Sequence, residues 1–245
     1  MAEGWFGTFG VLPERQGAGI GQRLINASLE YLRQEPGRLI GLETMPDSAD
    51  NLGLYLSRGF EARMLTLKLR KKLDSSTGAE LGLPSWSEAG TKDRRRWLTD
   101  LREATGHIRP GLDYTKEILS SARHQLGETV ILKEGRRAIG FSAVRLRDRR
   151  EGQDKERASV EVLAVEPDRT DQGALRALLQ ASEALGCAHG KREIVLPVNA
   201  RHTWALEQLL ARGYRVKGAS VRLVLGGTDD GPATDRHVDL SRWAG

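Results

Sequence analysis

One stretch of this sequence is present twice, 154 residues apart. Residues 11–69 align with residues 165–223 without a gap, and fifteen of the fifty-nine aligned positions are identical. The identities include a proline near the start of each copy (Pro13 and Pro167) and a glycine near its end (Gly59 and Gly213). These residue types mark turns and helix ends. A 245-residue chain with such a repeat is expected to fold as two similar units, each with its own core.

Both copies show the same order of hydrophobic periodicities. Alternating strand and helix patterns predict an α/β fold, in which helices pack on the faces of a sheet. The first helix of the first copy is expected to bury Ile20, Leu24, Ala27 and Leu32. In order of strand, helix, strand, helix and strand, the expected ranges are 5–12, 19–34, 39–44, 49–58 and 62–70 in the first copy, and 158–165, 173–185, 193–198, 203–212 and 216–225 in the second.

The two copies differ in what precedes them. Ahead of the second copy, the sequence predicts helices at 91–104 and 112–126 and a hairpin with strands at 129–133 and 138–145. Only ten residues precede the first copy, so it is expected to lack the front half of the unit. The expected domains are 1–73 (the back half of a unit), 74–90 (a linker), 91–227 (a complete unit) and 228–245 (a polar, loose tail).

Composition excludes several classes of function. No apolar run reaches the roughly 20 residues needed to cross a bilayer, and the N-terminus does not have the pattern of a secretory signal, so we expect a cytoplasmic protein. The net charge of +5 is dispersed and lacks interleaved aromatic residues, which argues against nucleic acid as a partner. The lone Cys187 is expected to pack rather than react. The five histidines have no ligand spacing, so no metal site is expected.

The segment from Val11 to Gly21 joins a strand to a helix and carries three glycines, Gly17, Gly19 and Gly21. Without β-carbons there, the backbone can approach a ligand and turn several N–H groups toward it, and the helix N-terminus adds partial positive charge. This arrangement suits a pyrophosphate. The alternatives are a turn that only lets helix and strand pack, and a dinucleotide site in which Glu43 binds a ribose; a Walker loop is excluded because no Gly-Lys-Ser/Thr follows.

The segment resembles the acetyl-coenzyme A loop of the GNAT superfamily of N-acetyltransferases, whose pattern of Gln or Arg, two residues, Gly, one residue, and Gly or Ala is matched by Gln16, Gly19 and Gly21. A second signature of that family follows as Asn51, Tyr55 and Gly59-Phe60. The resemblance covers residues 5–73 well and 91–226 more weakly. It implies a mixed, mostly antiparallel sheet flanked by helices, with the second region similar to the degenerate domain of tandem acetyltransferases.

The resemblance also implies a reaction and the roles of several residues. An acetyl group would pass from acetyl-CoA, as co-substrate, to a primary amine of a small molecule or peptide, and Tyr55 would protonate the departing thiolate; Tyr55 could instead only pack on its helix face. Glu3 and Glu43 are possible bases, and neither is assigned. The residues implied to bind the cofactor, with the pantetheine arm lying along the first strand, are Phe9, Gly10, Val11, Gln16, Gly17, Ala18, Gly19, Ile20, Gly21 and Asn51.

The second copy has lost these residues. Thr170, Asp171 and Leu175 stand where the first copy has Gln16, Gly17 and Gly21, and Ala205 and Leu209 replace Asn51 and Tyr55. An acid in the loop would repel a pyrophosphate. The second copy is therefore expected to be a scaffold. Two functions stay open for the chain, an N-acetyltransferase and a non-catalytic acyl-CoA-binding or scaffold protein. The first strand also offers a sheet edge through which homo-oligomers could pair.

Overall fold

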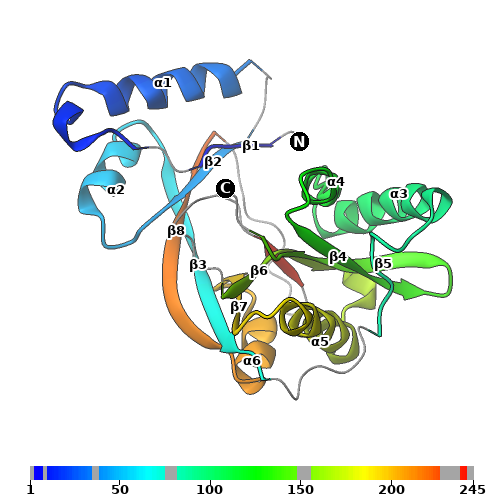
Figure 1. Cartoon of the computed structure of the whole chain (residues 1–245). Coiled ribbons are helices and arrows are strands. Elements are labelled where there is room, and N and C mark those ends of the chain that lie inside the picture. Colours follow the sequence, from blue (N-terminus) through cyan, green and yellow to red (C-terminus); the bar gives the residue numbers. More distant parts are fainter. Residues whose placement is uncertain are drawn as a thin grey trace. The chain divides into compact units, whose positions relative to one another are not determined.

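The computed structural model describes residues 3–7, 10–34, 39–74, 82–147, 156–226 and 238–241 (Figure 1). These residues fall into two compact units. Unit 1 contains the described residues up to 65 together with 219–226. Unit 2 contains the described residues from 66 to 218 together with 238–241.

Unit 1 is a small sheet with two helices. Strand β1 (Glu3–Trp5) lies parallel to β2 (Leu39–Thr44), and β2 pairs in antiparallel fashion with the end of β8 (Arg215–Leu225). A short 3-10 turn (Pro13–Arg15) leads into helix α1 (Ile20–Leu32), and helix α2 (Ala49–Leu56) follows β2. The buried core of this unit consists of Ile25, Leu29, Leu32, Ile40, Leu42, Phe60 and Leu223.

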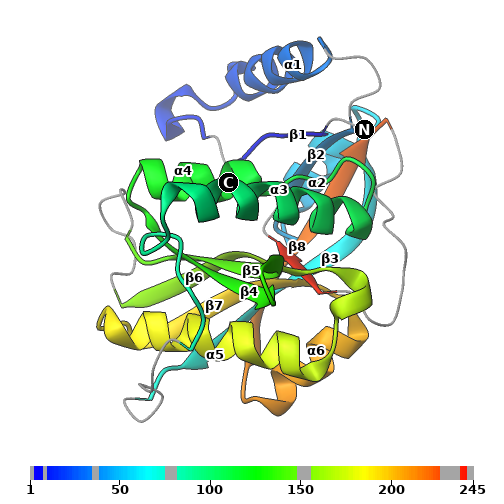
Figure 2. The same ribbon diagram turned by 90° about the vertical axis from the view of Figure 1, so that its right-hand side faces the viewer.

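Unit 2 has a larger, mostly antiparallel sheet in the order β3-β7-β6-β5-β4. Helices α3 and α4 lie over one face of this sheet and α5 over the other (Figure 2). The short strand β9 (Asp239–Ser241) pairs with β6. The elements are β3 (Glu61–Lys72), α3 (Thr91–Ile108), α4 (Thr115–Arg123), β4 (Gly127–Glu134), β5 (Arg137–Arg145), β6 (Arg157–Val165), the 3-10 turn Pro167–Arg169, α5 (Gln172–Ala188), β7 (Glu193–Asn199), α6 (Thr203–Ala211) and β8.

The sequence repeat is also seen in the pairing of the strands, because equivalent residues of the two copies have equivalent partners. Glu3 pairs with Leu39 in unit 1, and Arg157 pairs with Glu193 in unit 2, so both partners are displaced by the same 154 residues. The following turns, helices and strands keep this offset. The mixed, mostly antiparallel sheet flanked by helices is therefore confirmed. The left-handed helix ends are confirmed as well, with φ of 82° at Gly59 and 89° at Gly213.

The closing strands of the two repeats are exchanged. Strand β8, which closes the second repeat, pairs with β2 of the first through contacts such as Ile40 with Leu225. Strand β3, which closes the first repeat, pairs with β7 of the second, where Lys71 lies opposite Ile194. The compact units therefore differ from the predicted ranges 1–73 and 91–227, because hydrophobic periodicity predicts a strand without naming the strand that it pairs with.

Four details of the sequence analysis were wrong. The first strand was expected at 5–12, but β1 ends at Trp5, and the described residues 10–12 are in no strand. The buried face of α1 carries Ile25, Leu29 and Leu32, whereas Leu24 is 41% exposed, because the apolar residues of this helix satisfy two overlapping faces. The described end of the predicted linker, residues 82–90, is packed: the Trp86 amide donates to the Thr129 carbonyl at 2.8 Å. The predicted loose tail contains β9, in which Val238 and Leu240 are fully buried.

Candidate active site

The glycine-rich loop of unit 1 is open to solvent. Gly17 and Gly19 have φ of 79° and 72°, a left-handed conformation that favours glycine. A β-carbon added at Gly17 would meet no atom within 4 Å, and one at Gly19 would meet only Arg23 Nη1, at 4.0 Å. No side chain of the described residues therefore fills the space above this turn, and a ligand can approach the backbone.

The amides of this loop are unused within the described chain. The Arg15 and Gln16 amides donate to Leu12 and Pro13 carbonyls, but the amides of residues 17–22 donate to no described residue. Gly19 occupies the N-cap position of α1, and no side chain caps the helix there. Six consecutive amides without a described acceptor therefore lie next to the positive end of a 13-residue helix, an arrangement that favours anion binding.

Two side chains secure the loop. Gln16 Nε2 donates to the Val11 carbonyl at 3.1 Å, which ties the turn to the segment just before it. Arg23 Nη1 donates to the Ala18 carbonyl at 3.3 Å, which brings a guanidinium to the edge of the turn. Arg23 was missed in the sequence analysis, although a basic residue in the first turn of a helix after a glycine-rich loop is a signal that could have been used. Phe9 lies outside the described residues.

The equivalent loop of unit 2 is closed by its own side chain. Asp171, which replaces Gly17, is the N-cap of α5, and its Oδ1 accepts a hydrogen bond from the Ala174 amide at 2.6 Å. Ala174 is the counterpart of Ile20, whose amide has no acceptor among the described residues of unit 1. The carboxylate therefore satisfies an amide that an anion would otherwise need and adds like charge beside it.

Tyr55 lies in an aromatic cluster next to the first strand. Its ring centroid is 6.4 Å from that of Phe6 and 5.9 Å from that of Phe60, and both pairs are edge-on. The Tyr55 hydroxyl makes no hydrogen bond to any other described residue. Partial burial raises the pKa of Tyr55, an effect that Arg58 partly offsets, so the hydroxyl keeps its proton at neutral pH and can donate it.

Asn51 precedes Tyr55 by one turn of α2, so the two side chains share a face of this helix. Neither side chain has a hydrogen bond or ring contact with the loop at 16–21 among the described residues. The roles of both residues, and of the loop residues, stay predictions.

Glu43 is buried in an ion pair. Its Oε1 lies 3.5 Å from Arg222 Nη2, and both side chains are about 5% exposed or less. The Arg222 guanidinium also lies 5.3 Å from the centroid of the Trp5 ring, which covers Gly41 so closely that any β-carbon there would collide with it. A carboxylate held in this way is not presented to a ribose, which counts against the dinucleotide alternative. The sequence could not reveal this pair, because Arg222 comes from the exchanged strand.

The metal-ligating side chains and the cysteine considered in the sequence analysis form no second candidate site among the described residues. No group of three or more metal-ligating side chains occurs in the parts of the chain that the structure describes. Burial and the neighbouring Glu183 raise the pKa of the Cys187 thiol, which lowers its reactivity at neutral pH. Among the described helices, none is long and apolar enough to span a bilayer.

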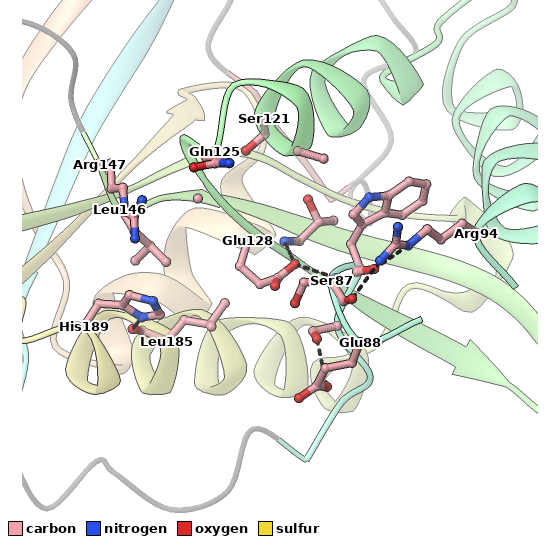
Figure 3. Close-up of a pocket in the computed structure, with 15 residues that line it drawn as sticks. Ser87, Glu88, Arg94, Ser121, Gln125, Glu128, Leu146, Arg147, Leu185 and His189 are labelled. Atoms are coloured by element: carbon pink, nitrogen blue, oxygen red, sulfur yellow. Dashed lines mark hydrogen bonds between the residues drawn. The ribbon is translucent and has the colours of Figure 1, made fainter. Parts of the chain in front are cut away.

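A cavity of about 550 Å³ in unit 2 contains none of the predicted site residues (Figure 3). Two of its charged side chains already bind backbone groups nearby. Glu128 Oε1 accepts hydrogen bonds from the amides of Ser87 and Thr129, and Arg94 donates to the Trp86 and Ser87 carbonyls at 2.9 and 2.7 Å. These bonds fasten residues 86 and 87 to β4 and α3, so the cavity is explained by the packing of this segment.

Comparison with known proteins also distinguishes the first copy of the repeat, which carries the open loop, from the second. The model of the acetyltransferase (GNAT) family matches residues 2–60. A protein from Pyrococcus horikoshii described as an acetyltransferase is 16% identical with a TM-score of 0.65, over 99% of this chain and 72% of that one. A GCN5-related N-acetyltransferase from Sphaerobacter thermophilus is 18% identical with a TM-score of 0.58, over 90% and 73%.

A tandem GNAT protein from the clavulanic acid biosynthesis pathway is 13% identical with a TM-score of 0.55, over 90% of this chain and 74% of that one. No curated protein matches the sequence. At these identities the solved structures show the fold, whereas the family model identifies the segment that carries the open loop and Tyr55. Residues 2–60 are therefore similar to the GNAT acetyltransferase family, and the chain has the fold of solved structures described as GNAT acetyltransferases.

Proposed function

We propose that this chain is an N-acetyltransferase that uses acetyl-CoA and acts through unit 1 on a primary amine of a small molecule or peptide. The observation that carries the proposal is the open turn at residues 17–22, with its unused amides and the adjacent Arg23. Charge-assisted backbone hydrogen bonds stabilise an anion by about 1.5–3 kcal/mol each, so three or four of them anchor a pyrophosphate without a charged side chain.

Acetyl-CoA supplies the activated acetyl group as a thioester. The residues that fit its pyrophosphate are the loop residues 16–21 and Arg23, and the pantetheine arm would lie along Gly10 and Val11, which precede the turn. The acyl-CoA-binding alternative requires the same loop.

Acetyl transfer to an amine requires one proton donor and one proton acceptor. Tyr55 fits the donor, since its hydroxyl has no other partner among the described residues and its raised pKa keeps it protonated. The amine must lose a proton before it attacks, which costs a lysine-like amine about 4.6 kcal/mol at neutral pH. A substrate site that desolvates the amine or supplies a base is therefore required, and Glu43 is a poor base because it is bound to Arg222.

Release of free thiol from acetyl-CoA in the presence of a panel of amines tests this function. Turnover that depends on both the amine and Tyr55 supports an acetyltransferase. Binding of acetyl-CoA with no thiol release for any amine would assign the chain to the acyl-CoA-binding class. Absence of binding at millimolar coenzyme would refute both functions.

A further inference from the structure

Strand β9 fills a gap in the sheet of unit 2. Strands β6 and β7 pair in parallel only at residues 157–159 and 193–195. Farther along, the same edge of β6 pairs with β9, in the antiparallel register that sets Leu163 opposite Leu240 and Ala164 opposite Asp239. Strand β9 also contacts β7, so it lies in the wedge where the two parallel strands separate.

The position of β9 corresponds, by the 154-residue offset, to the position that we assign to the pantetheine arm in unit 1. Leu163, Ala164 and Val165 are the counterparts of Phe9, Gly10 and Val11. The Val165 amide donates to the Val238 carbonyl at 3.1 Å, which continues the pairing of β9 to the end of this stretch. This correspondence rests on the proposed function, whereas the pairing of β9 with β6 does not.

The side chains of β9 are specifically held. Val238 and Leu240 are fully buried in the core of unit 2. The intervening Asp239 accepts hydrogen bonds from the Tyr114 hydroxyl, at 2.9 Å to Oδ1 and 3.1 Å to Oδ2. Two apolar residues that point into the core and an acid between them are a recognition pattern for an extended peptide, in which the backbone supplies affinity and the side chains supply selectivity.

We propose that the slot between β6 and β7 of unit 2 has become a binding site for an extended peptide, and that its ligand is the chain's own segment 238–241. The site takes a strand with apolar residues at its first and third positions and a carboxylate at the second. Asp171 closes the adjacent loop to a pyrophosphate. Unit 2 consequently binds no coenzyme, and each chain binds one molecule of acetyl-CoA, in unit 1.

The test removes the tail from its slot in the full-length chain. Val238→Asp combined with Leu240→Asp places two charges in the apolar core and is expected to release β9. The matched control is Leu119→Asp, the same change at a position of α4 that is 43% exposed. The probe is a fluorescently labelled peptide with the sequence Val-Asp-Leu-Ser, and a Val-Asp-Asp-Ser peptide serves as the negative probe.

The labelled peptide is expected to bind the double variant at least tenfold more tightly than the wild type or the control. In the wild type the tail competes at an effective concentration on the order of millimolar. Hydrogen exchange of the Val165 amide is expected to accelerate at least tenfold in the double variant. The Ile131 amide, which donates to the Pro84 carbonyl at 2.9 Å, reports the integrity of the same unit and is expected to stay protected.

Rapid exchange at Val165 in the wild type, or unchanged exchange and no peptide binding in the double variant, would overturn the proposal. If the double variant also loses protection at Ile131, Tyr114→Phe decides: faster exchange at Val165 alone supports the proposal, and unchanged exchange overturns it. Two molecules of acetyl-CoA per chain would overturn this proposal and leave the function of unit 1 intact. Absence of any acetyl-CoA binding would refute that function and leave the exchange test valid.

Discussion

The core of unit 2 contains a cluster of polar side chains, and unit 1 has apolar residues at the equivalent positions. We expect that the polar cluster can be replaced by these apolar residues. Glu183 is 1% exposed, and its Oε1 accepts a hydrogen bond from the Tyr214 hydroxyl at 2.9 Å. Its Oε2 lies 2.8 Å from Lys71 Nζ and 3.7 Å from Arg212 Nη2. Burial and the Glu183 carboxylate raise the pKa of Tyr214 well above its ordinary value, so Tyr214 stays a donor.

The same three positions are apolar in unit 1. The counterparts of Glu183, Tyr214 and Lys71 are Leu29, Phe60 and Leu225, which pack together in the core of that unit. The counterpart of Arg212 is Arg58, which donates to the Leu54 carbonyl at 2.7 Å instead of pairing with an acid at the equivalent position. An arginine at this position therefore tolerates an apolar neighbour.

Glu183→Leu alone is expected to destabilise unit 2. It leaves the buried Tyr214 hydroxyl without its acceptor, which costs about 1–3 kcal/mol. It also removes the closest anion from Lys71. Removal of one partner of a buried ion pair costs about 3–5 kcal/mol, and we take this as the whole loss of stability, with the Tyr214 term included. For a chain of this length each kcal/mol corresponds to about 2–4 °C, so the melting temperature is expected to fall by roughly 6–20 °C.

The triple variant Glu183→Leu, Tyr214→Phe and Lys71→Leu is expected to recover this loss or to exceed the stability of the wild type by about 1–4 kcal/mol, since the Tyr214 hydroxyl and the Lys71 ammonium are removed together with their acceptor. Urea unfolding followed by tryptophan fluorescence, to which the buried Trp86 and Trp97 of unit 2 contribute, measures both variants. A single variant as stable as the wild type, or a triple variant no more stable than the single one, would refute the reasoning.

Three further predictions concern the loop, the donor and an ion pair. Tyr55→Phe is expected to lower kcat at least tenfold with little change in acetyl-CoA affinity. Because the pKa of Tyr55 is raised, ionisation of its hydroxyl is expected to lower the rate of the wild type only at a higher pH than for an ordinary tyrosine; a pH–rate profile of both proteins checks this. Gly19→Val strains a left-handed residue and is expected to weaken acetyl-CoA affinity about tenfold in calorimetry, whereas Gly53→Ala, a change on the exposed side of α2, is expected to leave affinity unchanged. Hydrogen bonds from Arg137 lower the pKa of Glu166. The stabilisation that they give is therefore present above the ordinary carboxyl pKa and is lost as the pH falls through the lowered pKa. Glu166→Gln is expected to reduce the free energy of unfolding at pH 7 by about 1–3 kcal/mol, with the difference from the wild type vanishing in acid, and a difference that stays constant with pH would contradict this reasoning.

The sequence predicted the elements of the fold well, because apolar periodicity and turn residues are local signals. Strand β2 begins and ends as predicted, and the hairpin β4–β5 turns at Gly135, which has φ of 58°. The structure adds that equivalent residues of the two copies hold equivalent strand registers, which was not predicted. Pairing between strands depends on contacts far apart in sequence, so the exchange of β3 and β8 was not foreseen.

The candidate site was predicted in part for the same reason. The loop at 16–21 is one continuous segment, and its open amides agree with what its glycines suggest. Arg222, which binds Glu43, lies 179 positions away and belongs to the other repeat. Likewise, the tail contains only two buried apolar residues, Val238 and Leu240, which is too short a pattern to predict a strand against a polar background.

The central claim is that the amides of residues 17–22 receive the pyrophosphate of acetyl-CoA, and amide chemical shifts test it most directly. In a titration of ¹⁵N-labelled protein with acetyl-CoA, the amides of Gly17, Gly19 and Gly21 are expected to shift strongly, and those of Asp171 and Leu175 in the second loop are expected to stay in place. S-acetyl-pantetheine, which lacks the pyrophosphate, is expected to leave all five unchanged. Shifts confined to the second loop, or no shift in the first at saturating acetyl-CoA, would contradict the claim.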